Sequence, residues 1–496
     1  MRGLLVEIHF PMHISAMFGF ILDPTTTWGL IGIILFYVFG FIHILHALMN
    51  TRTSQGTIAW VVSLMFMPFL AIPLYWLLGR NKFEGYVRAR RGNDAELRKI
   101  AKDMSENLKK FAIDLPEENF FERCAEELGG LPFTRGNRLN LLIDGDETFQ
   151  EIFASINRAE KYICVNFFIV KHDKIGKKFQ QALIRRAKAG VKVYFLFDEI
   201  GSHKLSSTFL GEMEDAGVEC QSFGANRHWW SRLQLNFRNH RKILIVDGIE
   251  AYLGGLNVGD EYLGHSEKFG AWRDTHLYIQ GPAAEAVQLV FLEDWFWVCN
   301  QVPKLSWESN EQREDQITAI IPTGPADPIE SWQMLVIEAA NTAHEKLWIT
   351  SPYFVPDDGV ISALHLAAMR GVDVRIMLPE HPDHILVWLS SYSYYEQAIP
   401  FGVKIYRYKE GFLHQKVMLI DQRMATVGTA NLDNRSFRLN FEITAFVSDP
   451  DFIQEVNHML QEDFTKCTLS KIEDFTEKSF FFKIICRAAR LMSPLQ

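Results

Sequence analysis

The greater part of this 496-residue chain consists of the same segments repeated in the same order. The segment AKAGVKVYFLFD (187–198) matches AMRGVDVRIMLPE (368–380), and KYICVNFFIV (161–170) matches KLWITSPYFV (346–355). Two further pairs agree, DAGVECQSF with PFGVKIYRY and FLEDWFWV with MLQEDFTKC. Short strand-like runs resemble one another in many α/β proteins, but four correspondences in one order indicate an internal duplication. The chain should therefore fold as two similar halves.

Each copy alternates helical segments with Val-rich apolar runs, which is typical of strands covered by helices on both faces. In the first matched pair a helix ends at a glycine, Gly190 or Gly371, and a buried strand follows. We predict an α/β protein of two sandwich repeats packed as a pseudo-dimer within one chain. The predicted repeats cover residues 136–300 and 315–470, with a linker at 301–314 and an amphipathic tail at 471–496. The tail could lie at a membrane surface or cover the core.

Both repeats contain the pattern His, any residue, Lys, four apolar residues, Asp, as HRKILIVD from His240 and HQKVMLID from His414. Along a strand, residues i and i+2 point to the same face, so His240 projects with Lys242 and His414 with Lys416. The aspartates, Asp247 and Asp421, fall where a turn should follow the strand. Each motif is followed by an asparagine 17 residues after its histidine, Asn257 in GGLN and Asn431 in GTAN.

These residue types suit displacement at a phosphodiester. Two lysines neutralise the non-bridging oxygens, and two asparagines add fixed hydrogen-bond donors. One neutral imidazole can attack phosphorus while the other, protonated, gives its proton to the leaving alcohol, which produces a covalent phosphohistidine. A carboxylate near each histidine would stabilise its imidazolium, and the candidates are Asp274 and Glu442. Each of these could instead be a strand-end carboxylate in an ion pair. We predict no metal and no cofactor, because the lysines supply the charge that a metal would.

The overall charge and the cysteines narrow the class of protein. A net charge of −9 and a pI near 6.0 argue against a nucleic-acid partner, which would require a broad basic surface. The six cysteines form no CxxC pair, and Cys164 lies within an apolar run. We therefore predict buried free thiols and a reducing compartment.

Two uncharged stretches near the amino terminus predict a transmembrane hairpin over residues 28–79, with spans at about 28–48 and 57–79. A cleaved signal peptide is the alternative for the first span, but a second span follows at once. Residues 1–27 suit an interfacial segment, and residues 80–135 a charged helical connector. Several basic residues directly follow the second span, namely Arg80, Lys82, Arg88, Arg90 and Arg91. Because basic residues that flank a membrane span favour the cytoplasmic side, we expect both termini and the repeats in the cytoplasm.

The paired HxKxxxxD motifs, each followed by GGxN or GTxN, resemble those of the phospholipase D superfamily. Longer segments are similar to the bacterial cardiolipin synthases of that superfamily, among them NHRKILIVDGIEAYLGGLNVGDEY, WRDTHLYIQGP, TSPYFVPDD and FLHQKVMLIDQRMATVGTANLDNRSFRLNFEI. The similarity runs from about residue 50 to the end. It implies a multi-pass enzyme of the bacterial inner membrane that transfers a phosphatidyl group from one phosphatidylglycerol to a second, giving cardiolipin and glycerol.

The resemblance also implies roles for the motif residues. His240 would be the nucleophile and His414 the general acid, with Lys242, Lys416, Asn257 and Asn431 binding the phosphate and Asp274 and Glu442 orienting the histidines. Asp247 and Asp421 belong to the catalytic motifs but would chiefly hold the turns. Residues 380–399 match the family only loosely, which leaves the acceptor-lipid contacts open. The basic, aromatic stretch 225–238 is expected to meet lipid head groups.

Two other functions, and the assembly, stay open at this point. A lipid hydrolase of the same superfamily would differ only in resolving the phosphohistidine with water. A catalytically silent membrane scaffold would need no intact motifs, and both are intact here. The sequence leaves open whether the chain forms a homo-oligomer and whether phosphatidylethanolamine can replace one phosphatidylglycerol.

Overall fold

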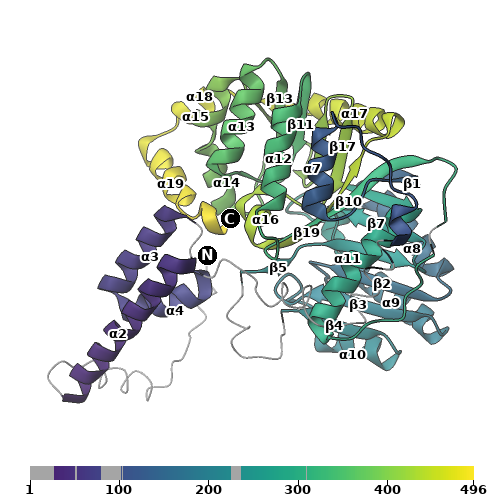
Figure 1. Ribbon diagram of the computed structural model, residues 1–496, viewed down its shortest axis with the longest axis horizontal. Helices are drawn as coiled ribbons and strands as arrows, with labels where there is room; N and C mark the ends of the chain where they lie inside the picture. Colours follow the sequence, from purple (N-terminus) through teal and green to yellow (C-terminus); the bar gives the residue numbers. More distant parts are fainter. Residues whose placement is uncertain are drawn as a thin grey trace. The chain divides into compact units, whose positions relative to one another are not determined.

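The computed structural model describes residues 27–50, 53–79, 102, 104, 106–224, 236–308 and 310–496. The amino-terminal helices form one compact unit and the two repeats form a second (Figure 1). Three predictions fall wholly or mostly outside the described residues: the interfacial segment 1–27, the basic residues that follow the second span, and the stretch 225–238.

The amino-terminal unit consists of α2 (Thr27–Asn50), α3 (Ser54–Phe66) and α4 (Pro68–Leu78). Among the described residues, α2 is the one helix long and apolar enough to cross a membrane. The residues of the second predicted span, 57–79, fall in two helices, because the helix breaks at Met67, whose φ is −139°. Pro68 lacks an amide hydrogen and disfavours a helical conformation in the residue before it. Both short helices pack on α2, and Trp76 Nε1 donates a hydrogen bond to His43 Nε2 over 2.7 Å.

The two repeats have matching strand orders, which confirms the duplication. The order β1-β9-β7-β6-β2-β3-β4 in the first repeat corresponds to β10-β19-β17-β16-β11-β13-β14 in the second, and β1 pairs with β10 antiparallel. The strands of the first repeat are β1 (Thr134–Ile143), β2 (Tyr162–Phe167), β3 (Lys192–Asp198), β4 (Glu219–Phe223), β6 (Lys242–Val246), β7 (Glu250–Gly254) and β9 (Thr275–Gln280). Those of the second are β10 (Gln316–Thr323), β11 (Lys346–Thr350), β13 (Asp373–Pro379), β14 (Lys404–Tyr408), β16 (Val417–Ile420), β17 (Met424–Gly428) and β19 (Asn440–Val447), with β20 (Cys467–Leu469) added at the edge.

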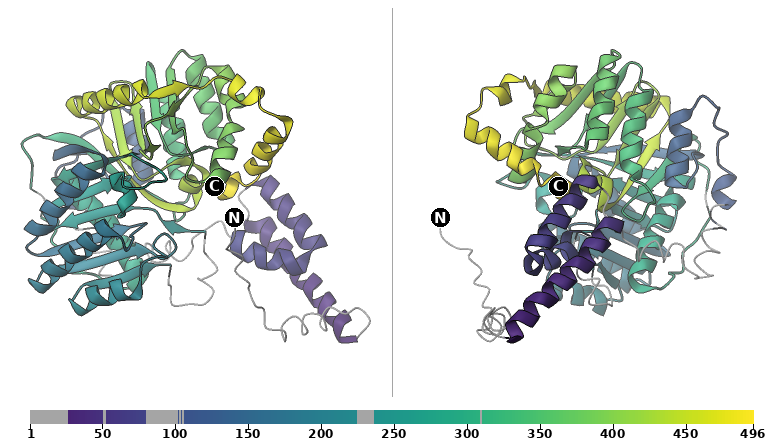
Figure 2. Two further views of the ribbon diagram at one scale, coloured as in Figure 1. Left: turned by 180° about the vertical axis from the view of Figure 1, so that it is seen from behind. Right: turned by 60° about the vertical axis from the view of Figure 1, so that its left-hand side comes forward.

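Helices cover both faces of these strands, as the apolar runs predict. On the outer faces lie α8 (Asp144–Arg158) and α9 (Lys174–Lys188) of the first repeat and α12 (Ser331–Thr342) and α13 (Asp358–Met369) of the second (Figures 1 and 2). The inner core combines both repeats and includes α11 (Pro282–Cys299) and α17 (Pro450–Thr465). Helix α11 is apolar on nearly every side because protein surrounds it, and Phe291 and Trp295 are fully buried.

The tail forms α18 (Glu473–Thr476) and α19 (Phe480–Arg490), and α19 packs on α14 (Ile385–Tyr392) of the second repeat. Cys486 is buried, and the Phe482 ring lies 5.7 Å from the Tyr392 ring. The opposite side of α19 exposes Phe481 and Ile485. The tail therefore covers the core with one face and leaves an apolar face exposed.

Candidate active site

Short parallel strand pairs that join the two repeats hold both histidines. β5 (Arg238–Asn239) pairs with the first residues of β19, and β8 (Trp272–Arg273) pairs with β15 (Phe412–Leu413). The His240 amide then donates to the Phe441 carbonyl over 3.0 Å, and the His414 amide to the Arg273 carbonyl over 2.8 Å. Each histidine is thus anchored to backbone from the other repeat, and both motifs lie where the repeats meet.

The carboxylates that contact the histidines are exchanged between the repeats. His240 Nδ1 lies 2.9 Å from Glu442 Oε2, and His414 Nδ1 lies 2.8 Å from Asp274 Oδ2. A carboxylate accepts hydrogen bonds, so each Nδ1 carries the proton and each Nε2 keeps its lone pair. The arrangement leaves both Nε2 atoms available for chemistry.

Glu442 is a fully buried anion with several donors. Its carboxylate accepts hydrogen bonds from Thr429 Oγ1 at 2.6 Å and Ser436 Oγ at 2.8 Å, besides His240. Burial by itself would raise the pKa of Glu442, but the charges and hydrogen bonds of His240, with Lys242, outweigh it and lower that pKa. Thr429 and Ser436 were not singled out from the sequence, although Thr429 stands inside the GTAN segment that follows the second motif.

The first repeat has Gly255 at the position of Thr429, and Asp274 explains why. A Cβ atom on Gly255 would lie 1.9 Å from Asp274 Oδ1, so any side chain would displace this carboxylate. Asp274 also accepts hydrogen bonds from the Thr275 amide at 2.8 Å and Trp272 Nε1 at 3.3 Å. The glycine is required by the close approach of the carboxylate that holds His414.

We expect Gly255→Ala to lower kcat by at least about a hundredfold, because the alanine methyl group would move Asp274 and with it His414. Gly211→Ala is the matched control: a Cβ at Gly211, within a surface helix, meets no atom within 4 Å. The control should keep wild-type turnover. Steady-state kinetics with near-ultraviolet circular dichroism as a check of folding would measure both, and normal turnover of Gly255→Ala would contradict the assignment.

The two lysines are buried beside the histidines. Lys242 Nζ donates to the His240 carbonyl over 2.6 Å, and Lys416 Nζ donates to the His414 carbonyl. Burial lowers the pKa of Lys242 to about 7 and that of Lys416 to about 8, against the opposing charges of the site carboxylates. A small change in environment can therefore change their charge near neutral pH.

The histidine pKa values show that the two motifs form one electrostatic site. Burial lowers the pKa of both His240 and His414 to about 4, and neighbouring lysines contribute to the shift. Lys416 of the second repeat lowers the pKa of His240, and Lys242 of the first repeat lowers that of His414. Both imidazoles are consequently neutral at pH 7.

The asparagines are buried and partly engaged with the protein. Asn257 accepts a hydrogen bond from the Ile169 amide at 3.0 Å and donates to the Tyr262 hydroxyl at 3.2 Å. Asn431 Nδ2 donates to Asp433 over 3.2 Å. Each asparagine is therefore held by neighbours of its own repeat.

Asp247 and Asp421 directly follow β6 and β16, in the turns that the sequence predicts. Both have positive φ, 54° and 52°. Asp247 accepts hydrogen bonds from the amides of residues 160, 161 and 162, and Asp421 from those of residues 344, 345 and 346. These carboxylates bind the backbone that leads into β2 and β11, and the structure does not bring them to the histidines.

Two further aspartates contact residues next to the motif histidines, and the sequence analysis did not single them out. Asp294 on α11 accepts hydrogen bonds from Arg241 at 2.5 Å and Asn239 at 2.9 Å, on either side of His240. Asp463 on α17 accepts from Gln415 at 2.7 Å, directly after His414. The signal was present, because both aspartates belong to the matched segments FLEDWFWV and MLQEDFTKC.

A duplicated α/β fold that brings two His–Lys motifs together, each with a carboxylate from the opposite repeat, defines the phospholipase D class of proteins. The family model "Cardiolipin synthase, PLD-like domain" matches residues 152–295 and 336–464, and "Phospholipase_D-nuclease N-terminal" matches residues 35–80. The chain belongs to the cardiolipin synthase family of PLD-like proteins.

Similar proteins agree with this assignment over nearly the whole chain. Cardiolipin synthase A of Pseudomonas syringae is 42% identical over 468 residues, covering 92% of this chain and 98% of that protein. Cardiolipin synthase A of Pseudomonas putida is 41% identical over 491 residues, covering 98% and 100%. The solved phosphatidylserine synthase of Haemophilus influenzae shares the fold, with a TM-score of 0.58, 15% identity, and coverage of 76% of this chain and 100% of that one.

Proposed function

We propose that this protein joins two molecules of phosphatidylglycerol into cardiolipin and releases glycerol. The observation that carries the proposal is the exchange of carboxylates between the repeats, because it makes two histidines and two buried lysines a single site for one phosphodiester. The names of the relatives support a lipid substrate.

In the first step His240 Nε2 attacks phosphorus, and the bond from phosphorus to the glycerol oxygen breaks. His414 gives its Nε2 proton to that oxygen, so glycerol leaves uncharged. In the second step neutral His414 takes the proton from the primary hydroxyl of a second phosphatidylglycerol, whose oxygen attacks phosphorus and releases His240. Lys242 and Lys416 neutralise the charge that builds up on the non-bridging oxygens. The assignment of His240 as nucleophile rests on the family resemblance.

The proton that His414 donates must be acquired when substrate binds. Burial lowers the pKa of His414 to about 4, so by itself its imidazole carries no donor proton on Nε2 at pH 7. A bound phosphodiester adds one negative charge beside it, which favours the imidazolium together with Asp274. His240, hydrogen-bonded to Glu442, stays neutral as the nucleophile.

The pH dependence of kcat/KM follows from the groups of the free enzyme. As pH rises through about 7 and about 8, Lys242 and Lys416 lose their charge and hold the phosphate less tightly, so kcat/KM should fall. As pH drops through about 4, His240 gains a proton and loses its nucleophilic lone pair, so kcat/KM should fall again. Initial rates in mixed detergent micelles at constant ionic strength would measure both limbs, and a flat profile from pH 6 to 10 would contradict the lysine role.

Incubation of the purified full chain with labelled phosphatidylglycerol tests the proposed reaction. Cardiolipin and free glycerol in equal amounts would support transfer. Phosphatidic acid as the sole lipid product would instead support the hydrolase alternative, in which water resolves the phosphohistidine.

We further propose that the chain is a multi-pass inner-membrane protein, with α2 as one span, α3 and α4 returning across the membrane, and the repeats in the cytoplasm. Basic residues after α4 support this orientation. The exposed apolar face of α19 would then rest on the bilayer. Accessibility of Phe481→Cys to a membrane-impermeant thiol reagent, compared from each side of sealed vesicles, would test the placement; labelling from the periplasmic side would contradict it.

A further inference from the structure

Three buried aromatic side chains lie around His414, and a fourth packs on them. The rings of Trp272, Phe412 and Tyr262 lie 5.2, 6.0 and 6.5 Å from the His414 ring. Phe269 is half-buried, and its ring lies 5.5 Å from that of Trp272 and 5.4 Å from that of Phe412. These four residues are called the aromatic cluster below. His240 has one such neighbour among the described residues, the Phe168 ring at 5.0 Å.

The aromatic cluster extends along His414 from its carboxylate to the phosphate site. At one end Trp272 Nε1 donates a hydrogen bond over 3.3 Å to Asp274 Oδ2, the oxygen that His414 Nδ1 also contacts. At the other end the Tyr262 hydroxyl accepts a hydrogen bond from Asn257 Nδ2 over 3.2 Å. The Trp272 and Tyr262 rings are 4.8 Å apart. Asn257 is a proposed phosphate-binding residue, so the cluster lies beside the region in which His414 would exchange a proton with an alcohol.

Polar residues take the place of the aromatic cluster beside His240. Three members of the cluster have counterparts in the other repeat, counted from the motif histidine, the site carboxylate and the motif asparagine. The counterparts of Phe412, Trp272 and Tyr262 are, in this order, Arg238, Asn440 and Ser436. The last two donate hydrogen bonds to the Glu442 carboxylate over 3.2 and 2.8 Å. The two repeats thus agree in their motif residues and differ in what surrounds each histidine.

The position of Phe269 is fixed where its loop meets the second repeat. The Phe412 amide donates a hydrogen bond to the Ala271 carbonyl over 2.8 Å. A Cβ atom on Gly411 would lie 2.1 Å from the same carbonyl oxygen, so the loop can approach this closely only because residue 411 is a glycine. The contact holds Phe269 over the Trp272 and Phe412 rings, on the side that solvent reaches.

A phosphohistidine can react with a lipid alcohol or with water. In transfer the alcohol oxygen forms a bond to phosphorus, the bond from phosphorus to His240 breaks, and His414 takes the alcohol proton. Water in the same position would give phosphatidic acid through the same bond changes, and its proton would again pass to His414. Either nucleophile approaches phosphorus opposite His240, in line with the bond that breaks. The surroundings of His414 therefore decide between them.

Aromatic surroundings disfavour water more than an alcohol. A buried water molecule needs roughly two to four polar partners, which aromatic carbon atoms do not supply. The carbon atoms of a glycerol group can pack on aromatic rings while its hydroxyl contacts the histidine. An aromatic cluster beside His414 is thus suited to a transferase, whereas a hydrolase would have to admit water at this place.

We propose that the aromatic cluster makes the enzyme specific for a lipid alcohol, by excluding water from the reaction at His414. The inference rests on the proposed function. Phe269 is the member to test, because it is half-buried and its replacement opens the cluster to solvent with the least loss of core packing.

The ratio of phosphatidic acid to cardiolipin measures the fate of the phosphohistidine and counts only active enzyme. Full-length enzyme in mixed detergent micelles would be given labelled phosphatidylglycerol, and both products would be quantified. Phe269→Ala should raise the ratio roughly tenfold, the usual scale on which one apolar group changes the choice between substrates. Total consumption of phosphatidylglycerol should stay within about threefold, because the first step is unchanged. Phe269→Leu keeps an apolar cover and should restore most of the wild-type ratio. In water labelled with a heavy oxygen isotope, the additional phosphatidic acid should carry the label on its phosphate.

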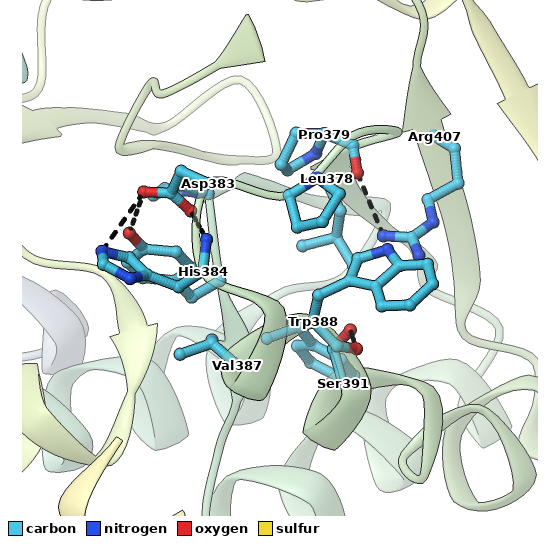
Figure 3. A pocket seen from close by; sticks show the side chains of 12 residues that line it. Leu378, Pro379, Asp383, His384, Val387, Trp388, Ser391 and Arg407 are labelled. Atoms are coloured by element: carbon cyan, nitrogen blue, oxygen red, sulfur yellow. Dashed lines mark hydrogen bonds and ion pairs between the residues drawn. The ribbon is translucent and has the colours of Figure 1, made fainter. Parts of the chain in front are cut away.

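Trp388→Ala is the matched control. Trp388 is also a half-buried ring in an aromatic group, 4.8 Å from the Tyr392 ring, but it lines a pocket of the second repeat that includes neither motif histidine (Figure 3). This variant should keep the wild-type ratio even if less of it folds. An unchanged ratio in Phe269→Ala would overturn the proposal and leave the proposed function standing. An equal rise in Trp388→Ala or in Phe269→Leu would overturn it as well. Wild-type enzyme that formed phosphatidic acid and no cardiolipin would instead defeat the proposed function itself.

Discussion

Replacing His240 with alanine is expected to lower phosphatidyl transfer by roughly 10⁴-fold or more, because the residue proposed to form the covalent bond to phosphorus is lost. His458→Ala provides the control, since its side chain is 73% exposed on α17. The control should turn over phosphatidylglycerol like the wild type. Thermal unfolding of both variants, measured beside the rates, would show whether the loss comes from chemistry or from folding.

The same prediction can be tested directly by trapping the covalent phosphohistidine intermediate. Wild-type enzyme quenched during turnover with lipid labelled at phosphorus should carry label on the peptide that contains His240, in a bond that alkali preserves and acid cleaves. His240→Ala should carry none. Label on His414 instead would reverse the two roles, and an unchanged rate in His240→Ala would remove this residue from the mechanism.

Replacing Lys242 with methionine should lower kcat/KM by roughly 10²- to 10³-fold, the usual effect of removing one group that stabilises transition-state charge. Methionine has a similar shape and no charge. Lys242 also helps to lower the pKa of His240, after burial, so its loss should raise that pKa from about 4. The acid limb of the kcat/KM profile should therefore move to higher pH in this variant.

The shift of the acid limb separates an electrostatic role from a purely structural one. A variant that was merely misfolded would lose activity at every pH without moving the limb. Lys346→Met is the control, because Lys346 is a partly buried lysine that binds Asn457 Oδ1 over 2.7 Å, away from the histidines. It should keep both the rate and the profile of the wild type.

Most of the architecture could be predicted from the sequence, because the duplication makes each repeat evidence for the other. The Val-rich runs form β3 and β13, and helices cover both faces of the strands as expected. Lys242 is the first residue of β6, and Lys416 directly precedes β16. The second apolar stretch forms two helices for a local reason, since Pro68 divides an otherwise continuous apolar sequence. Asp294 and Asp463 were missed although both lie in matched segments of the two repeats, because the role of a helical carboxylate becomes recognisable only when the tertiary structure brings its hydrogen-bond donors to it.

The sequence by itself determined that there are two His–Lys motifs, that each follows the same strand pattern, and that Asp274 and Glu442 are the candidate carboxylates. Only the tertiary structure decided that Glu442 serves His240 and Asp274 serves His414. In the sequence, the candidate carboxylate nearest to His240 is Asp274, and the one nearest to His414 is Glu442. Sequence separation alone would therefore pair each histidine with the carboxylate of its own repeat. The exchange arises because β5 pairs with β19 and β8 with β15, contacts that exist only once two folded repeats pack against each other.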